Sequence, residues 1–87
     1  MEVVFLRQPY KFIQKAKAEL TQKIKEEILV IAENPEVGKK LSGVKFKHIY
    51  IYKFVFIKVH YRIAYTVKNN IIVVCIATRE NFYKDLK

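Results

Sequence analysis

The sequence predicts an α+β fold in which an N-terminal helical hairpin packs on one face of an antiparallel four-stranded sheet. Two observations carry this prediction. Apolar residues recur at steps of three and four between Phe12 and Ile31, and the period changes to two from Phe46 onward. The predicted element order is β-α-α-β-β-β. Because 87 residues with 52% hydrophobic content suffice for one core, residues 1–87 are expected to form a single domain.

The first half of the chain is predicted to hold one strand and two helices. Val3–Leu6 is short, apolar and β-branched, as in a strand, and we expect it at a sheet edge. Pro9 fits the first turn of a helix, and Thr21 is a candidate cap for a second one. One long helix is the alternative, but a hairpin lets both apolar stripes cover one sheet. Asn34–Gly43, with its proline and two glycines, is predicted to be a loop.

Three strands are predicted in the second half. Phe46–Phe56 is aromatic and β-branched, and Tyr61–Val67 alternates between apolar and other residues, so that its odd-numbered positions share one face. Lys68–Asn70 is predicted to form a tight turn, because asparagine tolerates positive φ. Ile71–Ala77 is apolar at every position, which is typical of a central strand covered on both faces.

The charge of the chain is one-sided. The sequence has seventeen Lys and Arg residues and only eight Asp and Glu residues, which gives a net charge of +9. Such a balance favours a polyanionic partner, although charge can also serve solubility alone. The lone Cys75 excludes an internal disulfide and is expected to be a buried hydrophobe. With Glu2 in a short apolar start, we expect no signal peptide, no membrane span and a cytoplasmic location.

Several kinds of catalytic site are not expected. The chain has no glycine-rich phosphate loop, and its two histidines and one cysteine lack the short spacing of a zinc site. We therefore expect neither a metal nor a cofactor. His48 is predicted to be an ordinary strand residue. His60 is predicted to lie in a turn before Tyr61, at the edge of a site.

Basic and tyrosine side chains on the predicted strands suit a phosphate ester. Arginine offers planar, bidentate hydrogen bonds to a phosphoryl group, lysine adds a point charge, and tyrosine stacks on a base or transfers a proton. RNA carries its own nucleophile, the 2′-hydroxyl. A protein can cleave RNA by orienting that hydroxyl and stabilising the charge that develops. The alternative for any single lysine is a solvated position on the strand.

The segment "YKFVFIKVHYRIAY" (Tyr52–Tyr65), followed by "KNNIIVVCIATRENFYKDLK", resembles the RelE/ParE superfamily of type II toxin–antitoxin toxins. The resemblance includes the "NPEVGKKLSG" loop and the spacing of the final arginine and tyrosine, and it covers nearly the whole chain. It implies a toxin held in a hetero-oligomer by an acidic, RelB-like antitoxin. In the RelE branch it further implies ribosome-dependent cleavage of mRNA in the A site.

Four site residues follow from this resemblance by position. Arg62 would hold the scissile phosphate, and Arg79 would stabilise the transition state. Tyr83 would stack on the RNA or protonate it, and Lys53 would handle the 2′-hydroxyl proton. Val55 stands where the family has a second lysine.

Further RNA contacts are expected from Lys58, His60 and Lys47. Two alternatives stay open beside the ribonuclease. One is a ParE-like, non-enzymatic toxin that inhibits DNA gyrase. The other is a degenerate member of the fold that only binds its antitoxin or a nucleic acid.

The end of the chain makes a geometric prediction. Phe82 has the spacing to pin the tail back onto the sheet, which would aim Tyr83 toward Arg62. Arg62, Arg79 and Tyr83 should then converge on one pocket near Lys53.

Overall fold

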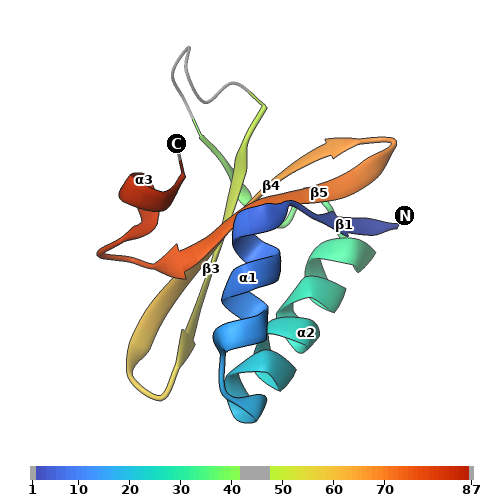
Figure 1. Cartoon of the computed structure of the whole chain (residues 1–87). Helices are drawn as coiled ribbons and strands as arrows, with labels where there is room; N and C mark the ends of the chain where they lie inside the picture. Colours follow the sequence, from blue (N-terminus) through green and yellow to red (C-terminus); the bar gives the residue numbers. More distant parts are fainter. Residues whose placement is uncertain (1, 42–47, 87) are drawn as a thin grey trace.

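The computed structural model describes residues 2–41 and 48–86, which form three helices and one five-stranded sheet of order β1-β5-β4-β3-β2. Figure 1 shows α1 and α2 side by side against the sheet, with the short α3 set apart from them. None of these helices is long and apolar enough to cross a membrane. The elements are β1 (Val3–Phe5), α1 (Arg7–Lys15), α2 (Ala18–Glu33), β2 (Lys39–Lys40), β3 (Tyr50–Phe56), β4 (Val59–Lys68), β5 (Asn70–Thr78) and α3 (Phe82–Asp85).

The α+β class and the helical hairpin are confirmed, but the sheet differs from the prediction. It is mixed, because β1 pairs with β5 in parallel at one edge. It also has a fifth strand, because β2 forms within the segment predicted as a loop. The helices separate at Ala16 and Lys17, whose backbones are extended. Thr21 therefore does not cap α2; its hydroxyl instead donates to the Ile13 carbonyl at 3.4 Å.

The turn between β3 and β4 and the start of β3 differ from the predicted positions. The β3–β4 turn lies at Ile57 and Lys58, which both have positive φ, and His60 belongs to β4 rather than to the turn. Positive φ at two central residues suits the twist of a two-residue hairpin. The predicted turn between β4 and β5 is confirmed, with Asn69 at φ 63°. His48 is exposed at φ 71°, before β3 begins, and is not a strand residue.

The two faces of the sheet have different cores. On one face, alternate residues of β3 and β4, including Phe54, Ile63 and Tyr65, pack with Ile24 and Ile28 of α2. This confirms the predicted alternation in β4. The opposite face carries a smaller cluster around the fully buried Phe82 of α3.

Strand β5 is central and is buried on both faces, as predicted. Val73 packs on the helix side, whereas Cys75 and Ala77 pack in the cluster around Phe82. The register shifts between Ala64 and Tyr65, which leaves Val74 as the extra residue of a β-bulge. Burial, with a smaller effect of Asp85, raises the pKa of Cys75 to about 12, so the thiol stays protonated.

The side chain of Gln8 extends the sheet where β1 ends. Strand β1 stops at Phe5, so the edge of β5 beyond Val73 has no strand beside it. The Gln8 amide oxygen accepts a hydrogen bond from the Ile76 N–H at 2.9 Å, and its Nε2 donates to the Ile76 carbonyl at 2.8 Å. One side chain thus satisfies both backbone groups of a buried residue and ties α1 to β5.

Helix α2 is tied to β3 by a polar contact. The Tyr52 hydroxyl donates to Glu27 Oε1 at 2.5 Å, and Lys23 pairs with the other carboxylate oxygen at 2.9 Å. Burial and the Glu27 carboxylate raise the pKa of Tyr52 to about 12. Burial also pushes the pKa of Glu27 upward, but hydrogen bonds from Tyr52 and Lys23 outweigh it and hold that pKa below its ordinary value.

Replacing Gln8 with alanine should lower the free energy of unfolding by about 2 kcal/mol, because the Ile76 N–H and carbonyl lose their partner. Gln14→Ala is the matched control on the exposed face of α1 and should change stability by less than about 0.5 kcal/mol. Urea unfolding measures both. Equal stabilities for the two variants would contradict the role given to Gln8.

The Tyr52–Glu27 contact should make stability depend on pH. A lowered folded-state pKa means that the Glu27 contribution is present above its unfolded pKa of about 4.3 and is lost as the pH falls through the folded-state value. Tyr52→Phe should therefore destabilise the protein more at pH 7 than at pH 3. Urea unfolding at both pH values tests this, with the exposed Tyr10→Phe as control. A loss that is the same at both would contradict the ionised contact.

Candidate functional site

The candidate site begins with two cations on the sheet face turned away from α1 and α2. Lys53 of β3 and Arg62 of β4 are direct cross-strand partners. Both alternate with residues that pack under the helices, so the period of two places them together on the other face. The Arg62 guanidinium carbon lies 5.8 Å from the centroid of the buried Phe82 ring. This contact holds the half-buried arginine in place, whereas Lys53 is exposed.

Two adjoining hollows meet at this pair. The first hollow has a volume of about 240 Å³ and the second hollow about 210 Å³. The first is lined by Lys39, Lys40, Leu41, Ile51, Lys53, Arg62 and Tyr83. The second is lined by Lys53, Phe54, Val55, His60, Tyr61, Arg62 and Arg79. Lys53 and Arg62 belong to both hollows and mark the boundary between them.

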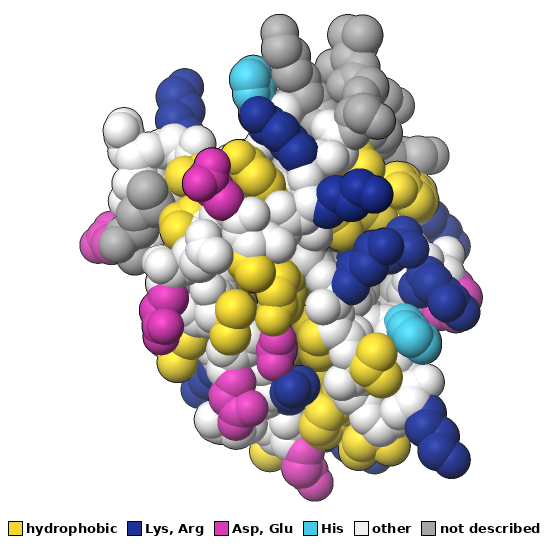
Figure 2. Space-filling model, turned by 180° about the vertical axis from the view of Figure 1, so that it is seen from behind, with side chains coloured by type: hydrophobic (Ala, Val, Ile, Leu, Met, Phe, Trp, Pro, Cys, Tyr) yellow, Lys and Arg dark blue, Asp and Glu magenta, His cyan; other side chains and the backbone are white. Residues whose placement is uncertain are grey.

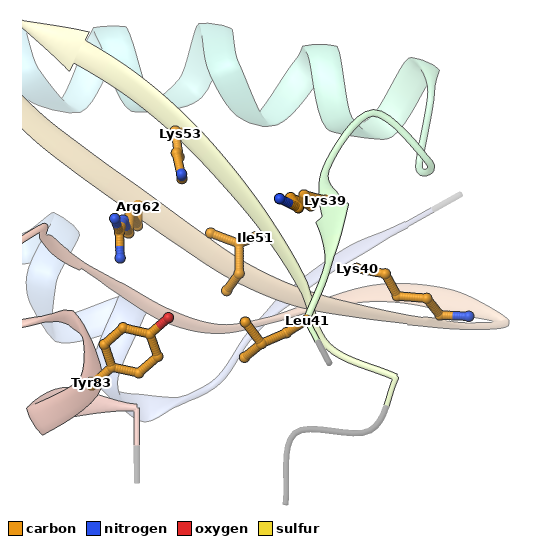
Figure 3. Close-up of a pocket in the computed structure, with 7 residues that line it drawn as sticks. All are labelled: Lys39, Lys40, Leu41, Ile51, Lys53, Arg62 and Tyr83. Carbon is orange, nitrogen blue, oxygen red and sulfur yellow. The ribbon is translucent and has the colours of Figure 1, made fainter. Parts of the chain in front are cut away.

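The tail places its two predicted site residues in different hollows. Phe82 pins the tail as predicted, and Tyr83 points into the first hollow (Figure 3). Arg79, however, lines the second hollow, so the prediction of one shared pocket is wrong for this residue. The reason is local: the Arg79 N–H bonds to the His60 carbonyl at 2.9 Å, which fixes it beside the start of β4.

The three residues expected to add RNA contacts lie in different places. His60 is exposed and lines the second hollow. Lys58 lies in the β3–β4 turn and is not among the lining residues of either hollow. Lys47 lies outside the described residues.

Sequence reasoning missed Lys39. It lies in β2 opposite Ile51, whereas Lys40 lies opposite Tyr50. Because neighbours in a strand face opposite sides, Lys39 enters the first hollow with Lys53 (Figure 3). Lys40 also lines this hollow, but its side chain extends to the other side of β2, where Nζ lies 5.9 Å from the centroid of the Tyr50 ring. A strand of two residues has no periodicity to detect, so the "KK" after Gly38 gave no signal beyond its charge.

A buried hydroxyl positions Lys39. The Tyr65 hydroxyl donates to the Pro35 carbonyl at 2.7 Å and accepts the Gly38 N–H at 2.9 Å. The Tyr65 side chain is fully buried, and that burial raises its pKa despite the Gly38 hydrogen bond. A Cβ on Gly38 would lie 2.6 Å from this hydroxyl, so the close approach requires glycine. Tyr65 thus anchors the segment that leads directly into β2.

Among residues 2–41 and 48–86, the cations of the site form no strong ion pair. Arg79 pairs with Glu80 at 3.9 Å, and both side chains are more than half exposed, so solvent screens the attraction. Figure 2 shows that most Lys and Arg side chains in that view gather on one side of the molecule, with acidic side chains mostly on the other. Among the described residues, no group of His, Cys, Asp and Glu is placed to hold a metal ion.

Solved structures that share this fold include three from E. coli. A RelE variant with two arginines replaced by alanine, in the free state, gives a TM-score of 0.76 at 20% identity and covers 98% of this chain and 92% of that one. The intact RelBE toxin–antitoxin complex gives 0.70 at 16% identity, covering 87% and 93%. The isolated RelE toxin gives 0.68 at 21% identity, covering 88% and 82%. The fold is therefore RelE-like.

A match to a family model classifies the chain more specifically than the fold does. A model for the ParE-like toxin of type II bacterial toxin–antitoxin systems matches residues 3–87, and the chain belongs to this family. Comparison with curated proteins found no match. The protein is thus a type II toxin with a RelE-like fold, which confirms the superfamily resemblance of the sequence.

Removing the Tyr65 hydroxyl should loosen the segment before β2. Tyr65→Phe leaves the Gly38 N–H and the Pro35 carbonyl without this partner, and we expect a loss of about 1–3 kcal/mol in the free energy of unfolding. Hydrogen exchange of the Gly38 and Lys39 amides should accelerate more than that of the β4 and β5 amides. Tyr50→Phe, which alters the ring stacked on Tyr65 at 5.3 Å, keeps both bonds and is the control. Uniform acceleration throughout the sheet would contradict a local anchor.

Proposed function

We propose that this toxin is a ribosome-dependent mRNA endonuclease that cleaves in the A site. The observation that carries the proposal is the cross-strand pair of Lys53 and Arg62 on the sheet face turned away from α1 and α2, flanked by Tyr83 and Lys39 on one side and by Arg79 on the other. Such a set binds a phosphodiester and leaves open space for the nucleotides on either side of it.

The proposed reaction uses the 2′-hydroxyl of the RNA. Its oxygen attacks the adjacent phosphorus as the hydroxyl proton leaves, a P–O2′ bond forms, and the P–O5′ bond breaks. The 5′ oxygen gains a proton, and the products are a 2′,3′-cyclic phosphate and a 5′-hydroxyl. The residues would act by holding the hydroxyl in line with the phosphorus and by stabilising the charge on the phosphoryl oxygens.

Each residue has a proposed part in this step. Arg62, held over Phe82, binds the phosphoryl oxygens, and Arg79 adds charge from the second hollow as the transition state forms. Lys53 handles the 2′-hydroxyl proton. Tyr83 stacks on the RNA or protonates the leaving oxygen. Lys39 would supply the second lysine charge that Val55 does not.

We further propose that an acidic antitoxin keeps the toxin inactive. The E. coli RelBE structure is a toxin–antitoxin complex, and the net charge of +9 here favours an acidic partner. A partly disordered antitoxin segment that folds on binding would cover a large part of so small a protein.

The second candidate function is inhibition of DNA gyrase without catalysis. The observation that favours it is the ParE-like description of the family. The two functions separate in paired assays on one purified preparation. Cuts within A-site codons on programmed ribosomes would support the endonuclease. Inhibited supercoiling without RNA cleavage would support the gyrase inhibitor. If the RNA stays intact and gyrase is unaffected, the result would support the degenerate member of the fold that only binds its antitoxin or a nucleic acid.

The proposed role of Lys39 can be tested against a matched lysine. Lys39→Gln should reduce cleavage on programmed ribosomes about tenfold or more, because one of the charges facing the phosphate is lost. Lys68→Gln removes the same charge at the far end of β4 and should leave the rate within about twofold. Arg62→Ala should abolish cleavage, and a bacterial host that expresses this variant should escape the growth arrest expected from the wild-type toxin. Equal rates for the Lys39 and Lys68 variants would contradict a direct role for Lys39.

A further inference from the structure

We infer that the second hollow is a nucleoside subsite of the messenger, which stacks the base on the side of the reacting phosphate away from Tyr83. This inference rests on the proposed function, and it assigns to Val55 and His60 a role that phosphate chemistry does not require. Its starting point is the position of Lys53 and Arg62 on the boundary between the two hollows.

The two hollows have the layout of a dinucleotide site. A phosphodiester links one nucleoside on each side, so a phosphate bound at the shared Lys53–Arg62 pair directs one nucleoside toward each hollow. At about 240 and 210 Å³, each is smaller than the roughly 300–1,000 Å³ of a site that encloses a drug-sized ligand. Each therefore suits one small part of a longer chain. Tyr83 provides a ring in the first hollow, which leaves the second hollow to be explained.

The second hollow has a wall suited to a base. Val55 and His60 are direct cross-strand partners on the same face as the Lys53–Arg62 pair. His60 is exposed, and Val55 is 50% exposed although it is a large apolar residue. A flat imidazole beside an apolar surface offers a stacking platform, which is how proteins hold splayed single-stranded bases.

Arg79 closes the same hollow from the tail. Its backbone N–H bonds to the His60 carbonyl, so both side chains project from one hydrogen-bonded pair of main-chain segments. An occupant of this hollow would meet an apolar wall, a stacking ring and a cation together. A lone phosphate would use only the cation, whereas a nucleotide would use all three. This combination is the reason for assigning the hollow to a nucleoside.

Replacing His60 should change substrate affinity more than turnover. On programmed ribosomes, His60→Asn should raise the apparent KM about tenfold or more with little change in kcat, because one base–ring stacking contact is lost. His60→Phe should restore the wild-type KM, because it retains a flat ring. His48→Asn is the matched control at the other exposed histidine and should leave both constants unchanged. A failure of phenylalanine to restore KM would overturn the stacking role.

Messengers that lack a single base can show which base of the RNA occupies the second hollow. One messenger lacks the base on the 5′ side of the cut and another lacks it on the 3′ side, and each is tested with wild type and His60→Asn. At one of the two positions, loss of the base should raise the wild-type KM but have little further effect on the variant. Additive effects at both positions would overturn the subsite.

The proposed function and the subsite can fail separately. If the wild-type protein leaves ribosome-bound RNA intact, the endonuclease proposal fails. In that case, wild type and His60→Asn are compared by their affinity for RNA trinucleotides. The trinucleotides are intact, or lack the base on the 5′ side or on the 3′ side of the bond that would be cut. Coupling between His60 and one base would retain the subsite, and additivity would remove it.

Discussion

The antiparallel pairing of β3 with β4 is the constraint on which both the core and the candidate site depend. Successive residues of these strands face opposite sides, so one register buries Phe54 and Ile63 beneath the helices and sets Lys53 opposite Arg62 on the other face. A slip of one residue would drive the two cations into the apolar core. Burial of the helix-side residues therefore fixes the position of the cations on the opposite face.

Two buried aromatic residues bring the rest of the site to this pair. Tyr65 holds the segment before β2 through its hydroxyl and so places Lys39 at the first hollow. Phe82 packs on the opposite face, lies under the Arg62 guanidinium and sets the start of α3, from which Tyr83 projects. Three segments distant in sequence thus meet at one place because side chains of the two cores hold them there.

Much of this arrangement follows from sequence periodicity, and the exceptions have local causes. The change of period from helix to strand predicted the class, the central position of β5 and the faces of β4, and the spacing of Phe82 predicted the pinned tail. Strand β2 was missed because two residues carry no period. Arg79 and Tyr83 line different hollows, and a backbone hydrogen bond places Arg79 beside His60, a pairing that sequence spacing does not encode.

The family supplies the class of protein, whereas the proposed chemistry rests on the cationic face and on the 2′-hydroxyl of the RNA. The most direct measurement replaces a single 2′-hydroxyl in the A-site codon, at the nucleotide 5′ to the cut, with hydrogen. We expect cleavage at this bond to be lost while the toxin still binds the programmed ribosome, because only the nucleophile has been removed. Cleavage at an undiminished rate would contradict attack by the 2′-hydroxyl.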